Sequence, residues 1–249
     1  PPRRASDRQA LLERGAVYFT KRVDTTLRGG IGYEIDAMLE VLPQETIAVV
    51  VPAMPQSRRI VVGGYSVIDS VALSCTDVAK DVRTPVTETF VPGLLSEQTH
   101  HQVKHIPLSC VLKGYHAISD ALIQQQREGA RVIVVDAISL ADVENIARAV
   151  TKLNWNVLAV DPGPFTERLA FTREMIRDEG RKEKALIPQE QQQGSIIVVA
   201  GSETPVTKKQ LTALIETDPR VCHIPIDAEL LIDKEHSADI EVARVVRQA

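Results

Sequence analysis

The chain repeats one pattern, in which a short apolar run is followed by a polar loop and then by apolar residues at helical spacing. Runs rich in Val, Ile, Leu and Ala predict buried β-strands, because a strand covered on both faces has no side for polar residues. Apolar residues three and four positions apart predict the intervening helices. We predict strands at residues 16–20, 46–51, 131–135, 157–160, 195–200 and 221–224. This repeat indicates an α/β fold with a mainly parallel sheet flanked by helices.

Residues 60–92 interrupt the pattern with short β-prone pieces, the pair Gly63-Gly64, and Pro85. Such a segment is typical of hairpins and loops, since it lacks the spacing of a long helix. We therefore predict a hairpin-rich insertion at residues 60–92. The polar, glutamine-rich segment at residues 180–194 is expected to be an exposed linker or a long loop.

The composition agrees with this fold class. Hydrophobic residues make up 44% of the chain but aromatic residues only 4%, so aliphatic side chains must build the core. A chain of 249 residues commonly folds as one large domain, and we treat residues 1–249 as a single α/β domain.

Charge and cysteine usage exclude several classes of protein. The net charge of −4 argues against a general nucleic-acid-binding protein, which needs a basic face. No apolar stretch approaches the ~20 residues that span a bilayer, and the opening residues do not resemble a signal peptide. The three widely spaced cysteines are typical of reduced thiols, so a cytoplasmic location is expected.

Polar residues with distinctive chemistry follow the predicted strands. They occupy residues 21–28, 52–59, Asp136, 161–166 and 201–204. In parallel sheets, ligands bind beyond the carboxyl ends of the strands. We therefore expect these segments to contribute to one site.

The loop at residues 21–30 is the richest of these segments, with three cations, one carboxylate, two hydroxyls and two glycines. Arg28 and either Lys21 or Arg22 can clamp a carboxylate or a phosphate. The pair Gly29-Gly30 lets a ligand approach the backbone at the start of a helix, where the amide dipoles favour an anion. The alternative is a solvated loop whose charges only pair with one another.

The other polar groups of this loop suit a hydroxylated ligand. Thr25 and Thr26 offer hydroxyl groups, and Asp24 can accept hydrogen bonds from substrate hydroxyls or act as a general base.

The remaining segments allow two interpretations each. Arg58 and Arg59 form either a second cationic arm or a surface pair. The turn at residues 201–205 is either a phosphate cradle or a helix start, with Thr204 as the N-cap and Pro205 at the first position. Asp136 and Asp161 could orient a substrate or a cation, or could cap a helix or close a turn. The six histidines are interpreted as structural or exposed, and we assign no metal ligands.

Together the motifs resemble the four-carbon acid sugar kinase family. The run Lys21-Arg22-Val23-Asp24-Thr25-Thr26-Leu27-Arg28-Gly29 is similar to its lysine-rich Asp-Ser-Thr-Leu-Arg-Gly signature, with Thr25 in place of Ser. Pro52-Ala53-Met54-Pro55 resembles a Pro-Ala-x-Pro segment, after which Arg58 stands where the family has Gly. The segment at residues 201–207 resembles a Gly-Ser-x-Ser-Pro-x-Thr turn. The resemblance runs from about Gly15 to Leu231.

This resemblance implies an ATP-dependent kinase acting on threonate-, erythronate- or oxo-tetronate-like acids, with Mg²⁺ bridging the ATP phosphates. By position, Arg22, Asp24 and Thr25 would contact the sugar acid, with Arg28 supporting them, and Ser202 would face the ATP phosphates. The substrate-binding residues are then Lys21, Arg22, Asp24, Thr25, Thr26, Arg28 and Arg59. The cofactor-binding residues are Gly201, Ser202 and Thr204, and Asp24 is the candidate catalytic base.

Two parts of the family pattern are not found in this sequence, an Asp-Asp-x-Thr-Gly-Ala strand end and a glycine-rich nucleotide domain. We therefore expect this sequence to be the substrate-binding part of such a kinase without its first strands. This part is expected to be inactive alone and to reach ATP through a further domain. A homodimer is the commonest assembly. The alternatives are a non-catalytic module that binds or senses a small organic acid and, less well supported, an enzyme of another class such as an aldolase or a dehydrogenase.

Overall fold

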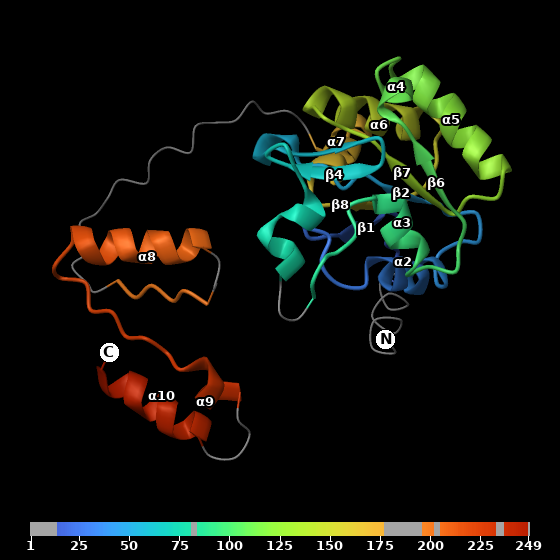
Figure 1. Cartoon of the computed structure of the whole chain (residues 1–249). Helices are drawn as coiled ribbons and strands as arrows, with labels where there is room; N and C mark the ends of the chain where they lie inside the picture. Colours follow the sequence, from blue (N-terminus) through green and yellow to red (C-terminus); the bar gives the residue numbers. More distant parts are fainter. Residues whose placement is uncertain (1–13, 81–83, 177–195, 202–204, 233–236, 249) are drawn as a thin grey trace. The chain divides into compact units, whose positions relative to one another are not determined.

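A computed structural model describes residues 14–80, 84–176, 196–201, 205–232 and 237–248 of the chain. The chain divides into two compact units, Pro1–Ile187 and Pro188–Ala249. Figure 1 shows the helices and strands of both units, coloured along the sequence.

The first unit is built on a five-stranded sheet in which every neighbouring pair of strands is parallel. Its strands, in spatial order, are β1 (Phe19–Arg22), β8 (Leu158–Asp161), β2 (Ala48–Val50), β7 (Val132–Val135) and β6 (Val103–Ile106). All residues of β2, β7 and β8 are buried, which explains their continuous apolar sequences. The predicted α/β fold with a parallel sheet is confirmed.

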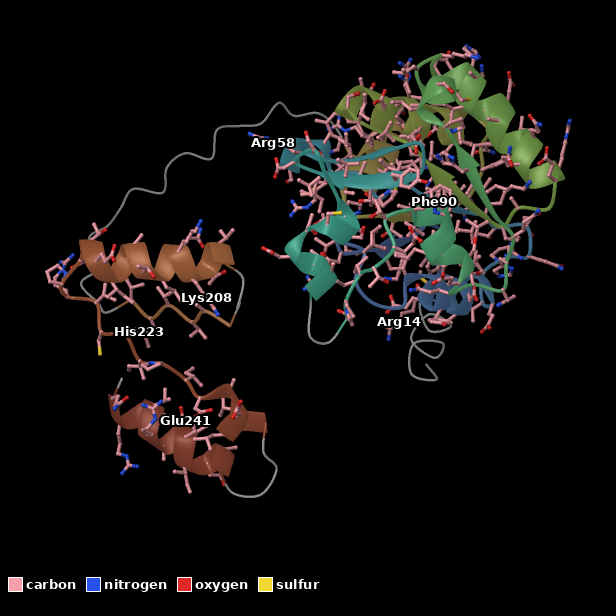
Figure 2. All side chains as sticks on the ribbon, viewed as in Figure 1. Arg14, Arg58, Phe90, Lys208, His223 and Glu241 are labelled. Atoms are coloured by element: carbon pink, nitrogen blue, oxygen red, sulfur yellow. The ribbon has the colours of Figure 1, made fainter. Side chains whose placement is uncertain are left out.

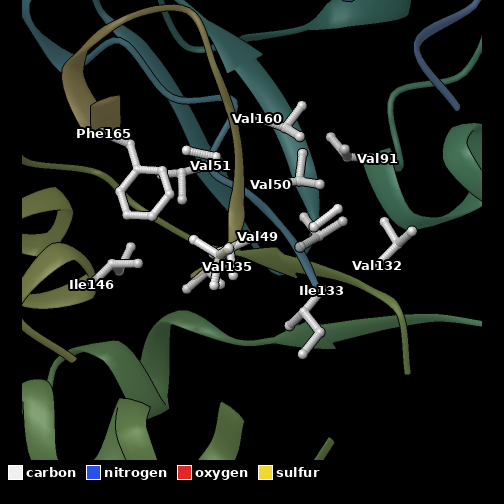
Figure 3. Packing of buried hydrophobic residues seen from close by; sticks show 14 of the residues in the cluster. Val49, Val50, Val51, Val91, Val132, Ile133, Val135, Ile146, Val160 and Phe165 are labelled. Carbon is white, nitrogen blue, oxygen red and sulfur yellow. The ribbon is translucent and has the colours of Figure 1, made fainter. Parts of the chain in front are cut away.

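Helices cover both faces of this sheet (Figure 1). They are α2 (Ile31–Leu39), α3 (Val91–Ser96), α4 (Leu108–Val111), α5 (Tyr115–Arg127), α6 (Leu140–Lys152) and α7 (Pro164–Thr172). Figure 3 shows Phe165 of α7 and Ile146 of α6 on one side of the strand residues, and Val91 of α3 on the other. These three side chains are at most 1% exposed. The aliphatic core therefore holds both helical layers to the sheet.

A separate three-stranded antiparallel sheet follows β2, which confirms the predicted hairpin-rich insertion. It consists of β3 (Arg59–Val62), β4 (Tyr65–Ile68) and β5 (Val71–Ala72). Gly63 and Gly64 connect β3 to β4 with φ of 62° and 80°, as a type I′ hairpin turn requires. Val61 also exchanges two backbone hydrogen bonds with Ala137, just beyond β7. The hairpin is therefore attached to the end of the parallel sheet.

The second unit contains α8 (Pro205–Thr217), α9 (Ala228–Ile232) and α10 (Ser237–Gln248). The predicted strands at 195–200 and 221–224 are wrong for the described residues, because 196–200 and 221–224 form no strand. Ile196 is 90% exposed. An apolar run becomes a strand only when a neighbouring strand takes its backbone hydrogen bonds, and the described part of this unit contains none.

Glu241 joins α9 and α10 within the second unit. Its carboxylate is 2% exposed and accepts hydrogen bonds from the backbone amide of Asp227 at 2.8 Å and from Arg244 Nε at 2.7 Å. Arg244 also donates to the Pro225 carbonyl at 2.6 Å. Across the described residues of both units, no helix combines the length and apolarity needed to cross a membrane.

Candidate functional site

Four of the five polar segments predicted from the sequence meet at the carboxyl edge of the five-stranded sheet, whereas the fifth, residues 201–204, belongs to the second unit. Residues 23–30 follow β1, residues 51–58 follow β2, and Asp136 and Pro162 follow β7 and β8. Backbone hydrogen bonds connect these strand ends, since Val23 donates to Asp161 at 3.1 Å. The parallel topology therefore brings these four segments to one edge.

Lys21 and Arg22, the last two residues of β1, make contacts that position the loop. Lys21 pairs with Glu34 in the first turn of α2 and donates to the Arg22 carbonyl at 2.8 Å. The Arg22 guanidinium donates to the Pro162 carbonyl. A Cβ on Gly163 would lie 2.9 Å from Arg22 Nη1, so the absence of a side chain there makes room for the guanidinium. Arg22 thus connects the loops that follow β1 and β8.

Asp24 organises the middle of the loop. Its carboxylate accepts hydrogen bonds from Thr26 Oγ1 and from Arg28 Nε, the latter at 2.6 Å. Burial raises the pKa of the Asp24 carboxyl, but the hydrogen bonds from Arg28 and Thr26 and the charge of Arg28 outweigh it, so the net pKa lies below its ordinary value. Asp24 is therefore ionised at neutral pH.

The backbone of the loop is held in an unusual conformation. Leu27 has φ of 57° although it carries a side chain, and that side chain is only 3% exposed. Left-handed backbone at a branched residue costs about 1–2 kcal/mol, and burial of the leucine side chain offsets it. Gly29 has φ of 91°, where a side chain would be strained. Strain of this kind is frequent at functional sites.

Gln98 is a contact of this loop that the sequence did not indicate. Its side chain accepts a hydrogen bond from the Gly32 amide at 2.9 Å and donates to the Gly29 carbonyl at 3.3 Å. Gly30 is the N-cap of α2 and has no side chain that could accept a hydrogen bond from the first turn. Gln98 therefore supplies an interaction at this helix start, from a position 66 residues away in the sequence.

Asp136 and Asp161, two of the buried aspartates, mainly stabilise the structure. Asp136 is fully buried and accepts hydrogen bonds from the amides of Gly63, Gly64 and Leu108 at 2.6, 3.0 and 2.9 Å. Its carboxylate also lies 2.8 Å from His105 Nε2. The type I′ turn is thus bound to the end of β7.

Asp161 serves a similar purpose at the end of β8. Its carboxylate accepts hydrogen bonds from the amides of Gly163, Phe165 and Thr166 at 2.7, 2.8 and 3.1 Å, and from the Thr166 hydroxyl. The first turn of α7 is therefore stabilised, as the capping interpretation of Asp161 proposed.

Arg58 and Arg59 differ although they are adjacent. Arg58 has φ of 54°, so it occupies the left-handed region that suits the glycine expected there. Its side chain is 82% exposed, pairs with Asp69 at 3.2 Å and extends away from the unit (Figure 2). The Nε of Arg59 is buried and has no hydrogen-bond partner among the described residues. A ligand could therefore reach this donor only after the Arg59 side chain moves.

The proposed nucleotide contacts lie elsewhere in the chain. Ser202 and Thr204 fall outside the described residues. Gly201 belongs to the second unit and is exposed, and among the described residues beyond its chain neighbours no heavy atom lies within 4 Å of the position of a Cβ there. The backbone at Gly201 is open to a ligand, and α8 begins at Pro205 as the sequence predicted.

Comparison with known proteins gives consistent results. A family model described as "Sugar-binding N-terminal domain" matches residues 4–169. The chain is 42% identical to a D-erythronate kinase of Heliobacterium modesticaldum, over 95% of this chain and 51% of that protein. It is 30% identical to a D-threonate kinase of Salmonella typhimurium, over 92% of this chain and 50% of that protein. The chain thus spans about half the length of these curated relatives.

Solved structures show the same fold. A Haemophilus influenzae protein matches with a TM-score of 0.63 at 24% identity, over 96% of this chain and 56% of that one. A Bordetella bronchiseptica domain of unknown function, described as a domain-swapped dimer with bound citrate, matches with a TM-score of 0.59 at 26% identity. That match covers 98% of this chain and 54% of the other.

Proposed function

The chain belongs to the four-carbon acid sugar kinase family, and we propose that it is the substrate-binding part of an ATP-dependent kinase that phosphorylates a four-carbon sugar acid. The observation that carries the proposal is the loop at residues 21–30, which leaves β1 at the carboxyl edge of the sheet with three cations. The acid is of the threonate, erythronate or oxo-tetronate type, and the 42% identity makes D-erythronate the first to test.

Cations at the loop support binding of a carboxylate. Lys21 pairs with Glu34 and Arg28 with Asp24, while the Arg22 guanidinium donates to the Pro162 carbonyl. Arg28 is 46% exposed and presents a planar guanidinium that suits a carboxylate. Arg59 is the remaining proposed contact, and its buried Nε would meet the acid only after the side chain moves.

The hydroxyl groups of the sugar acid are assigned to the polar residues of the same loop. The hydroxyl of Thr25 makes no hydrogen bond to any described residue, so it can bind substrate without losing a protein contact. Thr26 is already bonded to Asp24 and would fix that carboxylate. A lowered pKa keeps Asp24 ionised but makes it a weaker base. We therefore propose that the Asp24 carboxylate holds a substrate hydroxyl and the Arg28 guanidinium. Removal of the proton from that hydroxyl is its second proposed role.

ATP and Mg²⁺ complete the proposed reaction. The open backbone at Gly201, followed by Ser202 and Thr204 before α8, fits a phosphate group at a helix start. Bound Mg²⁺ would neutralise charge on the ATP phosphates. Because phosphoryl transfer depends mostly on positioning and charge, the task of residues 21–30 is to orient the acid. Most of the ATP contacts are proposed to come from a domain not included in this chain.

A kinase assay distinguishes this proposal from a sensing module. The whole protein that contains this chain would be tested for ADP release with ATP, Mg²⁺ and each of D-erythronate, D-threonate and 3-oxo-tetronate. We expect turnover with at least one acid and none with the uncharged tetritol erythritol. Saturable acid binding without ADP release would favour the non-catalytic module instead.

The assembly can be tested separately. We propose a homodimer, on the basis of the Bordetella relative described as a domain-swapped dimer. Light scattering coupled to size exclusion would contradict this proposal if it gave the mass of one chain.

A further inference from the structure

A second group of polar side chains lies outside the proposed substrate site. Asp36 of α2 and the adjacent His100 and His101, which precede β6, each offer one ligand atom, and these atoms lie within 4.8 Å of one another. Asp36 Oδ2 is 2.8 Å from His100 Nδ1, and Asp36 Oδ1 is 4.0 Å from His101 Nε2. The two imidazole rings are 4.1 Å apart between centroids.

Hydrogen bonds fix the carboxylate and the turn that carries the histidines. Thr99 Oγ1 donates to Asp36 Oδ1, and the His100 amide donates to Asp36 Oδ2 at 3.2 Å. The His101 amide in turn donates to Thr99 Oγ1 at 3.1 Å. Outer contacts of this kind orient metal ligands in known sites. The two elements are therefore held together before any ion binds.

The group is open to solvent on one side. The His100 side chain is 64% exposed, so an ion can reach the group from solvent. The His101 side chain is 17% exposed and is the more covered of the two imidazoles. Zinc binds the deprotonated nitrogen of an imidazole.

We propose that Asp36, His100 and His101 bind one Zn²⁺ ion. Two imidazoles and one carboxylate are ligands typical of zinc, and a hard ion such as Mg²⁺ prefers oxygen alone. Tetrahedral zinc with bonds of ~2.0–2.2 Å separates its ligand atoms by about 3.4 Å. In the structure the two histidine nitrogens face different oxygens of Asp36, at 2.8 and 4.0 Å, so side-chain rotation would bring one of these oxygens to both nitrogens. Water would fill the fourth position.

The position of Asp36, His100 and His101 indicates that the ion would stabilise the structure. Zn²⁺ would connect the middle of α2 to the turn between α3 and β6. Gln98 in the same turn already contacts the start of α2 at Gly32. The ion would therefore add a second connection between these segments and leave the proposed substrate contacts unchanged.

Metal titration of the chain tests the proposal. The 249-residue chain, prepared without a histidine tag and freed of metal with a chelator, would be titrated with ZnCl₂ in a calorimeter. Binding of Co²⁺ would be followed by its visible absorption, which reports tetrahedral ligation. His100→Ala and His101→Ala remove ligands, and Thr99→Val removes an outer contact. His116→Ala is the control, because His116 contacts Lys152 instead of this group.

We expect one Zn²⁺ per chain and a higher melting temperature with the metal. Affinity should fall at least ~10-fold in His100→Ala and His101→Ala and about 10-fold in Thr99→Val, and remain unchanged in His116→Ala. The exposed His100 can be replaced without loss of folding, which circular dichroism would verify. Absence of saturable binding, equal binding by His100→Ala, or tighter binding of Mg²⁺ than of Zn²⁺ would overturn the proposal.

Discussion

Replacement of Asp136 by asparagine tests how the hairpin is attached to the sheet. Oδ1 of Asp136 accepts from Gly64 and contacts His105, while Oδ2 accepts from Gly63 and Leu108. Asparagine keeps only one of these oxygens and turns an NH₂ group toward the other pair of partners. The least damaging arrangement faces the NH₂ toward His105, whose tautomer can change, and still leaves the Gly64 amide without an acceptor.

The loss of stability in Asp136→Asn follows from these contacts. One buried amide without a partner costs roughly 1–3 kcal/mol, and the bonds from Gly63 and Leu108 weaken when the acceptor loses its charge. We expect Asp136→Asn to lower the free energy of unfolding of the first unit by about 2–5 kcal/mol. Urea unfolding followed by the fluorescence of Trp155 measures the free energy of unfolding of the first unit, because the single tryptophan of the chain lies in that unit.

Asp69→Asn provides a matched control in the same hairpin. The Asp69 side chain is 59% exposed and, among the described residues, pairs with the exposed Arg58 alone, so its replacement should cost less than ~1 kcal/mol. If Asp136→Asn changed stability no more than Asp69→Asn does, Asp136 would not hold the hairpin and the reasoning would be refuted.

One further substitution and one pH titration test local features. Arg58→Gly should stabilise the first unit by about 0.5–1 kcal/mol in the same urea assay. The substitution removes left-handed backbone strain at φ of 54° and loses an exposed ion pair. A loss of stability would show that the Arg58 side chain contributes more to stability than its backbone strain costs. In the second unit, hydrogen bonds from Arg244 and from the Asp227 amide lower the pKa of Glu241 from 4.5 to about 2. Because the folded value is the lower one, this carboxylate should stabilise the unit fully above about pH 4.5 and lose that contribution as the pH falls toward 2. A carbon NMR titration of the Glu241 carboxyl group should have its midpoint near 2, whereas a midpoint near 4.5 would contradict the contacts between α9 and α10.

The fold could be predicted where burial alone determines the sequence. β2, β7 and β8 are covered on both faces, so their sequences are almost wholly apolar. The edge strand β6 contains Lys104 and His105 and was not predicted, because a strand with polar positions lacks that signal. Residues 196–200 have the apolar sequence of a strand, but strand formation also depends on a partner that the run itself does not specify.

The candidate site, like the fold, could be predicted only in part. Parallel topology predicts that residues after β1, β2, β7 and β8 gather at one edge, and they do. Contacts between distant segments had no local signal, as with Gln98 at Gly32 and Arg22 at Pro162. Asp136 could have bound a ligand or closed a turn, and only the structure shows that three amides occupy its carboxylate. His100 and His101 were interpreted as structural or exposed, because Asp36 lies far from them in the sequence.

Acid binding by the chain tests the central claim most directly. In calorimetric titrations, D-erythronate should bind saturably and erythritol, which has no carboxylate, should not. Arg28→Ala should weaken acid binding at least ~10-fold, about 1.4 kcal/mol, and Arg127→Ala, which removes an exposed arginine at the end of α5, should change nothing. Equal affinity of Arg28→Ala and the unaltered chain for D-erythronate, or equal binding of erythritol, would contradict a carboxylate site at residues 21–30.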